Sequence, residues 1–392
     1  MEQWKTYTLE ELTIGKGTYG IGASAVPYDS SKYTYLRITD INDDGTLNKN
    51  ELKSVDDVDA DKYVLQVNDI VFARTGNSTG RSYFYDGSDG VLVYAGFLIK
   101  FSLDPAKVNP RIMKYYTHSQ EYYDWVKSFD TGGTRGNINA KTYGSMPITL
   151  PPRDVQDKIV EVLKSLDEKI ELNKRINDNL EQQAQAAFNN IIAQYSESET
   201  INLSEIAVLN PKRAIAKRTL ARSIEMAQLP TSGSFPAGWD MKEYNGGMKF
   251  QNGDTLMARI TPCLENGKVA YINFLEDNEV AFGSTEYIVI ASKGAIKPEV
   301  FYFLTRYSDF VDFAVKNMNG SSGRQRVSAE TIGKYEIPLI SPEDMAVLET
   351  IAKEALNKIK YNSLENIRLS EIRDTLLPKL MSGELEINDL DC

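Results

Sequence analysis

The chain has 392 residues, more than one ordinary hydrophobic core accommodates, so two or three domains are expected. Hydrophobic residues make up 42% and charged residues 25%, which excludes a disordered chain, and no apolar run approaches the roughly 20 residues that span a bilayer. The net charge of -11 argues mildly against nucleic acid, but phosphate binding depends on local Lys and Arg, and several loops carry arginine with little acid nearby.

The N-terminal residues 1–5 lack a basic segment followed by an apolar one, so no secretory signal is predicted and the expected location is the cytoplasm. Cys263 and Cys392 are too few to form a zinc site or a disulfide framework by themselves. Neither a metal site nor redox chemistry is therefore expected from the cysteines.

Residues 14–22, IGKGTYGIG, carry the G-x-G-x-x-G spacing of a phosphate-binding loop. A dinucleotide fingerprint would open a helix, whereas Pro27 and residues 29–31 predict a loop. A kinase would need H-R-D and D-F-G motifs, but His118 is the only histidine, Ser and Gln follow it, and D-F-G is absent. The glycines therefore predict a strand and turn, not a nucleotide pocket.

Residues 40–51 fill every required position of an EF-hand calcium loop. An EF-hand loop follows an amphipathic helix, whereas residues 33–39 alternate β-branched and aromatic side chains as a strand does. The sequence therefore favours a polar hairpin turn, with calcium binding as the alternative.

An internal repeat organises the chain. Residues 69–75, DIVFART, align with residues 254–260, DTLMARI, at an offset of 185 that places Arg74 on Arg259. Each segment predicts a short apolar strand that ends on arginine and leads into a polar loop. The chain is therefore expected to contain two similar strand-rich regions.

Two long helices are predicted at residues 152–194 and 342–381, each opened by proline and rich in Glu, Lys, Leu, Ala and Gln. Mostly apolar positions recur at alternating steps of four and three, and the two series lie 189 residues apart. Their period of 3.5 predicts a left-handed coiled pair. The series are Ile159, Leu163, Leu166, Ile170, Asn173, Asn177, Leu180, Ala184, Ala187 and Ile191, and Leu348, Ala352, Ala355, Ile359, Asn362, Asn366, Leu369, Arg373, Leu376 and Leu380.

Each series places two asparagines at successive positions, Asn173 with Asn177 and Asn362 with Asn366. Polar residues in such a seam can fix register and orientation. If the helices are antiparallel and overlap fully, the four asparagines meet. The alternative is two separate amphipathic helices, each covering its own domain.

The expected fold is α+β, with two strand-rich regions at residues 1–150 and 196–340 joined by antiparallel helices at 151–195 and 341–392, in a pseudo-twofold repeat. A helix of about 40 residues is roughly 60 Å long. Such a chain suits a target with two separated half-sites.

Residues 252–270, NGDTLMARITPCLENGKVA, and 282–290, FGSTEYIVI, resemble a target-recognition-domain signature of the specificity (S) subunits of type I restriction-modification systems. Other resemblances extend the likeness over essentially the whole chain: NPKR at 210–213, YGIGASA at 19–25, YLRITDI at 35–41, LPPRDVQDKI at 150–159 and IRDTLLPKLMSGEL at 372–385. The two helix starts, at residues 153–156 and 342–345, depart from the family pattern around its usual Gln.

The resemblance implies that each head is a target-recognition domain that reads half of a bipartite duplex DNA sequence, while the helices set the spacing. It also implies two methyltransferase subunits docked on the helices and added restriction subunits, with S-adenosylmethionine, ATP and Mg held by those partners. The chain itself would be non-catalytic, and it carries no S-adenosylmethionine glycine motif, methylase tetrad or helicase phosphate loop. The alternatives are a complete enzyme and a calcium-binding or coiled-coil adaptor.

The predicted DNA-binding residues are polar or basic and lie in the loops or in the motifs quoted above, where Arg suits guanine and phosphate and Asn, Ser and Thr suit other edges. They are Tyr19, Arg37, Arg74, Asn77, Ser78, Arg81, Thr134, Arg135, Asn137, Lys212, Arg213, Arg259, Thr261, Asn266, Lys268, Ser321, Ser322, Arg324 and Arg326.

Overall fold

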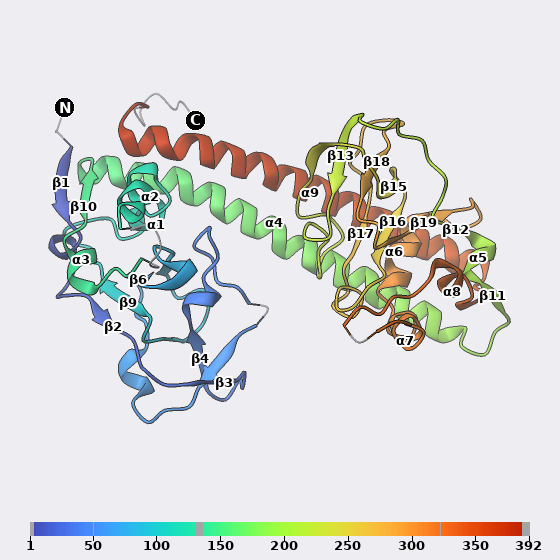
Figure 1. The fold of residues 1–392 in the computed structure, drawn as a ribbon, viewed down its shortest axis with the longest axis horizontal. Helices are drawn as coiled ribbons and strands as arrows, with labels where there is room; N and C mark the ends of the chain where they lie inside the picture. The colour runs from blue at the N-terminus through green and yellow to red at the C-terminus, as the bar shows by residue number, and fades with distance from the viewer. Residues whose placement is uncertain (1–3, 50, 130–135, 322, 386–392) are drawn as a thin grey trace. The chain divides into compact units, whose positions relative to one another are not determined.

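A computed structural model describes residues 4–49, 51–129, 136–321 and 323–385. The chain divides into two compact units, unit 1 (Met1–Asp167 with Ser370–Cys392) and unit 2 (Glu168–Leu369). Both include part of each long helix, α4 (Arg153–Gln194) and α9 (Pro342–Ser382), labelled in Figure 1. The compact units therefore cut across both helices, and the domain limits at 150, 195 and 340 stay predictions.

Unit 1 contains two four-stranded sheets, in the orders β2-β9-β6-β7 and β3-β5-β4-β8, and a pair of antiparallel strands, β1 and β10. Its strands are β1 (Lys5–Thr8), β2 (Thr18–Tyr19), β3 (Ala25–Pro27), β4 (Tyr33–Leu36), β5 (Lys53–Val55), β6 (Asp69–Ala73), β7 (Ser82–Tyr85), β8 (Leu92–Tyr94), β9 (Leu98–Ser102) and β10 (Pro147–Leu150). Its short helices are α1 (Ile112–Tyr116), α2 (Gln120–Lys127) and α3 (Ala140–Gly144).

Unit 2 has sheets in the orders β12-β19-β16-β17 and β14-β13-β18-β15, and pairs β11 with β20. Its strands are β11 (Thr200–Asn202), β12 (Ala207–Leu209), β13 (Leu220–Ile224), β14 (Asp240–Glu243), β15 (Met248–Phe250), β16 (Thr255–Ala258), β17 (Val269–Tyr271), β18 (Ala281–Gly283), β19 (Tyr287–Ser292) and β20 (Glu336–Pro338). Its short helices are α5 (Leu203–Ile206), α6 (Glu299–Thr305), α7 (Ser308–Lys316) and α8 (Ala329–Gly333).

The internal repeat is visible in the sheets. The central strand β6 lies between β7 and β9, and its counterpart β16 lies between β17 and β19, with all four pairings antiparallel. The second sheets differ, because the parallel pair is β4 with β8 at an edge in unit 1 and β13 with β18 in the centre in unit 2. The expected α+β fold with an internal repeat is confirmed.

The glycine-rich stretch at residues 14–22 contains the short strand β2 and leads to β3, so it opens no helix as a dinucleotide-binding loop would. A Cβ atom at Gly20 would overlap the carbonyl oxygens of Tyr94 and Ala95, whereas one at Gly22 would meet nothing within 4 Å. Glycine is needed at position 20 because two backbone segments approach each other there.

The segment that matches an EF-hand loop is a tight turn after β4. The N–H of Asn42 donates to the carbonyl of Thr46 at 2.9 Å, and Ile41 bridges Leu47 in antiparallel register. Asp40, which would be the first calcium ligand, is buried and accepts hydrogen bonds from Arg37 at 2.6 and 2.9 Å. Asn50 of this segment lies outside the described residues.

The two long helices lie side by side and antiparallel within each unit, as expected (Figure 1). In unit 2 the Asn173 amide donates to Oδ1 of Asn366 at 2.9 Å, and the Asn362 amide donates to Oδ1 of Asn177 at 2.8 Å. In unit 1, Nη1 of Arg373 lies 3.1 Å from Oδ1 of Asp167. The alternative of two separate helices is wrong.

The helix seam departs from its predicted period near the end of α4. The steps of four and three predict burial of Ala187 and Ile191, but the buried side chains after Ala184 are Phe188 and Ile192. These side chains join the core of unit 2, because the helix there packs against the sheets and short helices of the unit as well as against α9. A strict heptad describes contact with one partner helix only.

Each unit has its own apolar core, built from its sheets and from segments of the long helices. In unit 1, Leu163 of α4 and Leu380 of α9 are fully buried with Phe72 and Phe101 of the sheet. Burial of such side chains stabilises by about 1.5–3 kcal/mol each. No helix of the described residues is long and apolar enough to cross a membrane.

Candidate nucleic-acid interface

The two predicted arginines, Arg74 and Arg259, occupy the same backbone setting in the two units. Each follows the central strand of its sheet, β6 or β16. The N–H of Arg74 donates to the carbonyl of Phe97 at 3.1 Å, just before the neighbouring strand β9. The N–H of Arg259 donates to the carbonyl of Glu286 at 3.0 Å, just before the neighbouring strand β19. The position 97 in unit 1 therefore corresponds to 286 in unit 2.

A second loop joins each arginine in the same way. The carbonyl of Arg74 accepts from Ile138 at 3.0 Å, and the carbonyl of Arg259 accepts from Val327 at 3.0 Å. The residues before these donors are the predicted DNA-binding residues Asn137 and Arg326, which the structure brings beside the arginines. The two units thus present a common backbone frame with different side chains.

In unit 1 the guanidinium of Arg74 lies 5.0 Å from the ring centre of Tyr19, which is close enough for a cation–π contact. Its Nη2 lies 3.5 Å from Oδ1 of Asn137, at the limit of a hydrogen bond. Nε of Arg74 is buried and has no acceptor among the described residues. Arg74, Tyr19 and Asn137, all predicted from the sequence, therefore form one site.

In unit 2 the carboxylate of Glu286 lies between two arginines. It accepts from Nε of Arg259 at 3.1 Å and takes a bidentate contact from Arg326, with Nη2 at 2.8 Å and Nε at 2.9 Å. The Arg326 hydrogen bonds, with those of Arg259, outweigh partial burial and lower the pKa of Glu286. Glu286 is not among the residues predicted from the sequence, because the strand repeat has an offset of 185 and only the backbone hydrogen bonds match Glu286 to Phe97.

Several other predicted cations are already paired. Arg37 contacts Asp40, as described above, and Arg81 lies 2.7 Å from Asp43 through Nε and donates from Nη1 to the Ile41 carbonyl at 3.1 Å. These contacts tie the turn at residues 41–47 to neighbouring strands. Among the described residues, Arg37 and Arg81 therefore stabilise loops through carboxylate partners, whereas Arg74 contacts Tyr19 and Asn137.

Arg213 and Lys268 of unit 2 are also engaged. Arg213 is nearly buried and donates to Oδ2 of Asp254 at 2.6 Å, while burial raises the pKa of Asp254 to about 6 despite this contact. Lys268 donates to the Met226 carbonyl at 2.7 Å. Both side chains therefore stabilise their own unit, and their contact with DNA stays a prediction.

The remaining predicted contacts differ in exposure. Ser78 is buried and Thr261 is half-buried. Thr134, Arg135 and Ser322 lie outside the described residues. The exposed members are Asn77, Asn137, Lys212, Asn266, Ser321 and Arg324.

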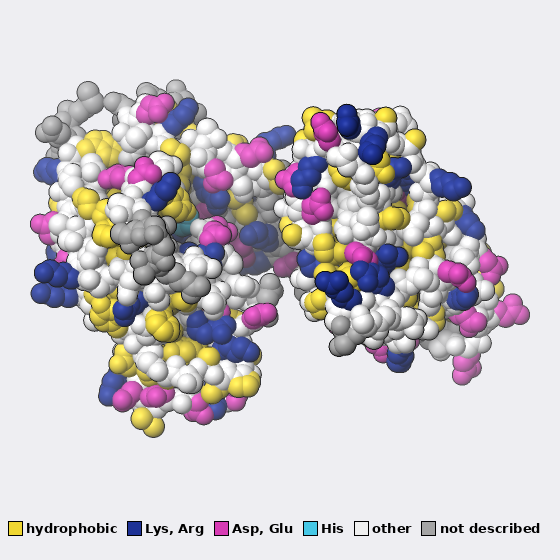
Figure 2. Space-filling model, in the orientation of Figure 1, with side chains coloured by type: hydrophobic (Ala, Val, Ile, Leu, Met, Phe, Trp, Pro, Cys, Tyr) yellow, Lys and Arg dark blue, Asp and Glu magenta, His cyan; other side chains and the backbone are white. Residues whose placement is uncertain are grey.

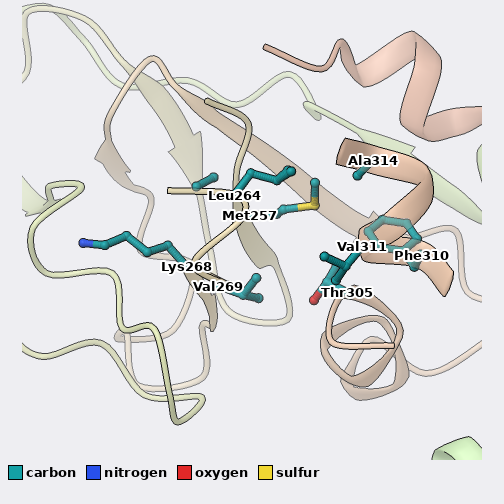
Figure 3. A pocket seen from close by; sticks show the side chains of 10 residues that line it. Met257, Leu264, Lys268, Val269, Thr305, Phe310, Val311 and Ala314 are labelled. Atoms are coloured by element: carbon teal, nitrogen blue, oxygen red, sulfur yellow. The ribbon is translucent and has the colours of Figure 1, made fainter. Parts of the chain in front are cut away.

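A pocket in unit 2 lies behind the loop at residues 261–268. Figure 3 shows the side chains of Met257, Leu264 and Phe310 directed toward one another, while Lys268 extends away from them. The labelled lining is mostly apolar, with Thr305 as its hydroxyl group. Such an apolar lining packs against the loop at residues 261–268 and offers no pair of groups for acid–base chemistry.

The surface charge is locally mixed. Figure 2 shows groups of Lys and Arg side chains on the visible face of each unit, with acidic side chains among them. The negative total therefore does not prevent local basic surface. Within the described ranges, no three His, Cys, Asp or Glu side chains are grouped as metal ligands.

Comparison with known proteins agrees with this arrangement. The type I restriction enzyme HindI specificity subunit of Haemophilus influenzae is 23% identical over 474 aligned positions, which cover 98% of this chain and 100% of that protein. The EcoEI specificity subunit of Escherichia coli is 27% identical over 199 positions, covering 47% of this chain and 33% of that protein.

A crystal structure of the type I restriction-modification S subunit from M. genitalium is similar in fold, with a TM-score of 0.60, 17% identity and 96% coverage of both chains. The sequence profile described as type I restriction modification DNA specificity domain matches residues 1–182 and again residues 195–366. The chain therefore belongs to the type I restriction-modification DNA specificity family, with two copies of the domain.

Proposed function

We propose that this chain is the specificity subunit of a type I restriction-modification complex and that each unit reads one half of a split duplex DNA sequence. The observation that carries the proposal is the repeated frame around Arg74 and Arg259, in which the same backbone hydrogen bonds hold an arginine at the end of a central strand. Arginine in such a position can read guanine through two hydrogen bonds or hold a phosphate.

The two frames carry different side chains, which suits two different half-sites. Unit 1 places Tyr19 and Asn137 around its arginine, and unit 2 places Glu286 and Arg326 there. Two identical frames would favour a symmetric target, whereas these favour a split target with unlike halves.

The catalytic steps belong to other subunits in this proposal. Two methyltransferase subunits dock on the paired helices and bind S-adenosylmethionine, and restriction subunits bind ATP and Mg. This chain supplies the DNA sequence preference and acts in the cytoplasm. The helices α4 and α9 support such a role because each of them has residues in both units.

The test is methylome sequencing of host DNA with and without this gene, in a strain that holds the neighbouring methyltransferase gene. We expect modified adenines at one split motif to disappear when the gene is removed. Replacement of residues 1–150 by the corresponding region of another family member should then change one half of that motif and leave the other half unchanged.

An unchanged methylation pattern after gene removal would contradict the proposal. The control is the same strain with the chain restored from a plasmid, which should return the original motif. A restored motif rules out loss of the methyltransferase gene as the cause.

A further inference from the structure

The strands β9 and β19 pair with the central strands of their units, and the residue just before each of them has a different kind of side chain. Phe97 precedes β9 and is 60% exposed, although it is a large apolar side chain. Glu286 precedes β19 in the matching position, because Arg74 and Arg259 donate to the carbonyls of these two residues. One backbone position thus carries an aromatic ring in unit 1 and a carboxylate in unit 2.

Glu286 controls which nitrogens of Arg259 are available. It accepts from Nε at 3.1 Å, whereas Nη1 and Nη2 of Arg259 have no acceptor within the described part of the chain. A guanidinium held by one edge presents its other donors in a fixed direction. Arg326 meets the same carboxylate, so the group keeps a net positive charge.

Phe97 leaves the arginine of unit 1 in a different state. With no carboxylate in that position, Nε of Arg74 is buried without an acceptor among the described residues, and the guanidinium rests near the Tyr19 ring. The exposed ring of Phe97 is a surface for apolar contact.

We propose that positions 97 and 286 determine base specificity in the two half-sites, an inference that rests on the proposed function. Glu286 is a positioning residue that directs the donors of Arg259 toward a guanine edge. Phe97 contacts DNA itself and favours a base with an apolar group in the major groove, the thymine methyl. The equivalent arginines Arg74 and Arg259 thus take part in reading different base pairs because the residue beside each of them differs.

The experiment uses the full chain expressed with its methyltransferase partner, and the readout is the methylated motif. In F97E the new carboxylate should accept from Nε of Arg74, as Glu286 does for Arg259. We expect preference at one base pair of the first half-motif to change by roughly 5- to 150-fold, with the second half unchanged. Because Phe97 is exposed, this substitution leaves the core intact.

E286F is the reciprocal change, and we expect it to relax one base pair of the second half-motif by a similar factor. E286Q is the conservative variant, since its amide oxygen still accepts from Arg259, and it should keep the motif at a lower extent of methylation. A merely structural role for Glu286 would make E286F lower methylation without changing any base preference.

Two matched controls introduce the same side chains elsewhere. V58E places a carboxylate at a position of unit 1 that is 98% exposed, and E243F places an aromatic ring at an exposed position of β14 in unit 2. Neither should alter the motif. A change in V58E equal to that in F97E would overturn the inference, since any added charge would then act alike.

The experiment distinguishes failure of the proposed function from failure of the role proposed for position 97. A wild-type chain that directs no split motif contradicts the proposed function. A wild-type chain that directs one, together with an F97E chain that methylates it with unchanged preference, overturns the role of position 97 while the function stands.

Discussion

The side-chain amide of Asn173 donates to Oδ1 of Asn366 at 2.9 Å, across the pairing of α4 and α9. One turn along, the amide of Asn362 donates to Oδ1 of Asn177 at 2.8 Å. Asn173 and Asn362 are almost fully buried, and a buried amide without a partner is unfavourable. The pairing therefore favours the one register in which all four asparagines meet.

Replacing Asn173 by Ala should destabilise the chain by about 1–3 kcal/mol, because Asn366 loses its donor inside the helix pair. The measurement is urea unfolding of the purified chain. The double variant N173A/N366A should lose less than the sum of the two single variants, as expected for residues that interact directly.

The control for this cycle is Asn190→Ala, an exposed asparagine near the end of α4, which should change stability by no more than about 0.5 kcal/mol. Strict additivity of N173A and N366A would show that their hydrogen bond contributes nothing.

Much of this helix pairing was predictable from the sequence, because a seam with a period of 3.5 needs only the spacing of residues. The end of the seam was not, since Phe188 and Ile192 turn toward the core of unit 2, which no local pattern reveals. Burial by tertiary contacts overrides a heptad wherever a helix meets a second surface.

The candidate site was predictable in part for a similar reason. The repeat identified Arg74 and Arg259 as strand-end residues, and the structure brings Asn137 and Arg326 beside them. Pairing was invisible in the sequence, because the partner of Arg213 lies 41 residues away at Asp254. A loop arginine and a buried ion-pair arginine look the same in one sequence.

Gly20→Ala should destabilise unit 1 by about 1–3 kcal/mol or more, because its Cβ would overlap the carbonyl oxygens of Tyr94 and Ala95. Gly22→Ala is the matched control, since a Cβ there meets nothing within 4 Å. Thermal unfolding of both variants measures the difference. Equal midpoints for G20A and G22A would contradict the close approach of the two backbone segments.

Asp167 should make the stability of unit 1 depend on acid pH. Burial alone would raise the pKa of its carboxyl, but Lys114 at 2.8 Å and Arg373 at 3.1 Å outweigh burial and lower it. A carboxyl whose pKa is lower in the folded chain stabilises fully above its unfolded pKa, about 3.9, and loses this contribution as pH falls through the folded value.

D167N should therefore unfold more easily than the wild type at pH 7, by about 1–3 kcal/mol, with a gap that closes below about pH 4. Thermal midpoints from pH 3 to 8 measure it. Glu161→Gln, an exposed change on the same helix, is the control and should show no such gap. A D167N gap that persists unchanged at pH 3 would argue that packing, not charge, is responsible.

Arg213→Met should destabilise unit 2 by about 3–5 kcal/mol at pH 8, because it leaves the buried Asp254 carboxylate without its counter-ion. The pKa of Asp254 is already about 6 in the folded chain, so at lower pH the neutral carboxyl needs Arg213 less. The stability gap to wild type should widen as pH rises above about 6. Where the variant is folded, the methylated motif should not change.

Lys212→Ala is expected to weaken DNA binding and leave the stability of unit 2 unchanged, in contrast to Arg213→Met, since Lys212 is exposed and Arg213 is not. An exposed lysine that meets a phosphate releases about one counter-ion, so its removal should reduce the slope of log affinity against log salt by about 0.9. Binding of the reconstituted complex to DNA with the motif, measured by fluorescence anisotropy over a salt series, gives this slope. A changed motif with an unchanged slope would mean that Lys212 reads a base edge, because base contacts discriminate between sequences whereas phosphate contacts weaken all sequences alike.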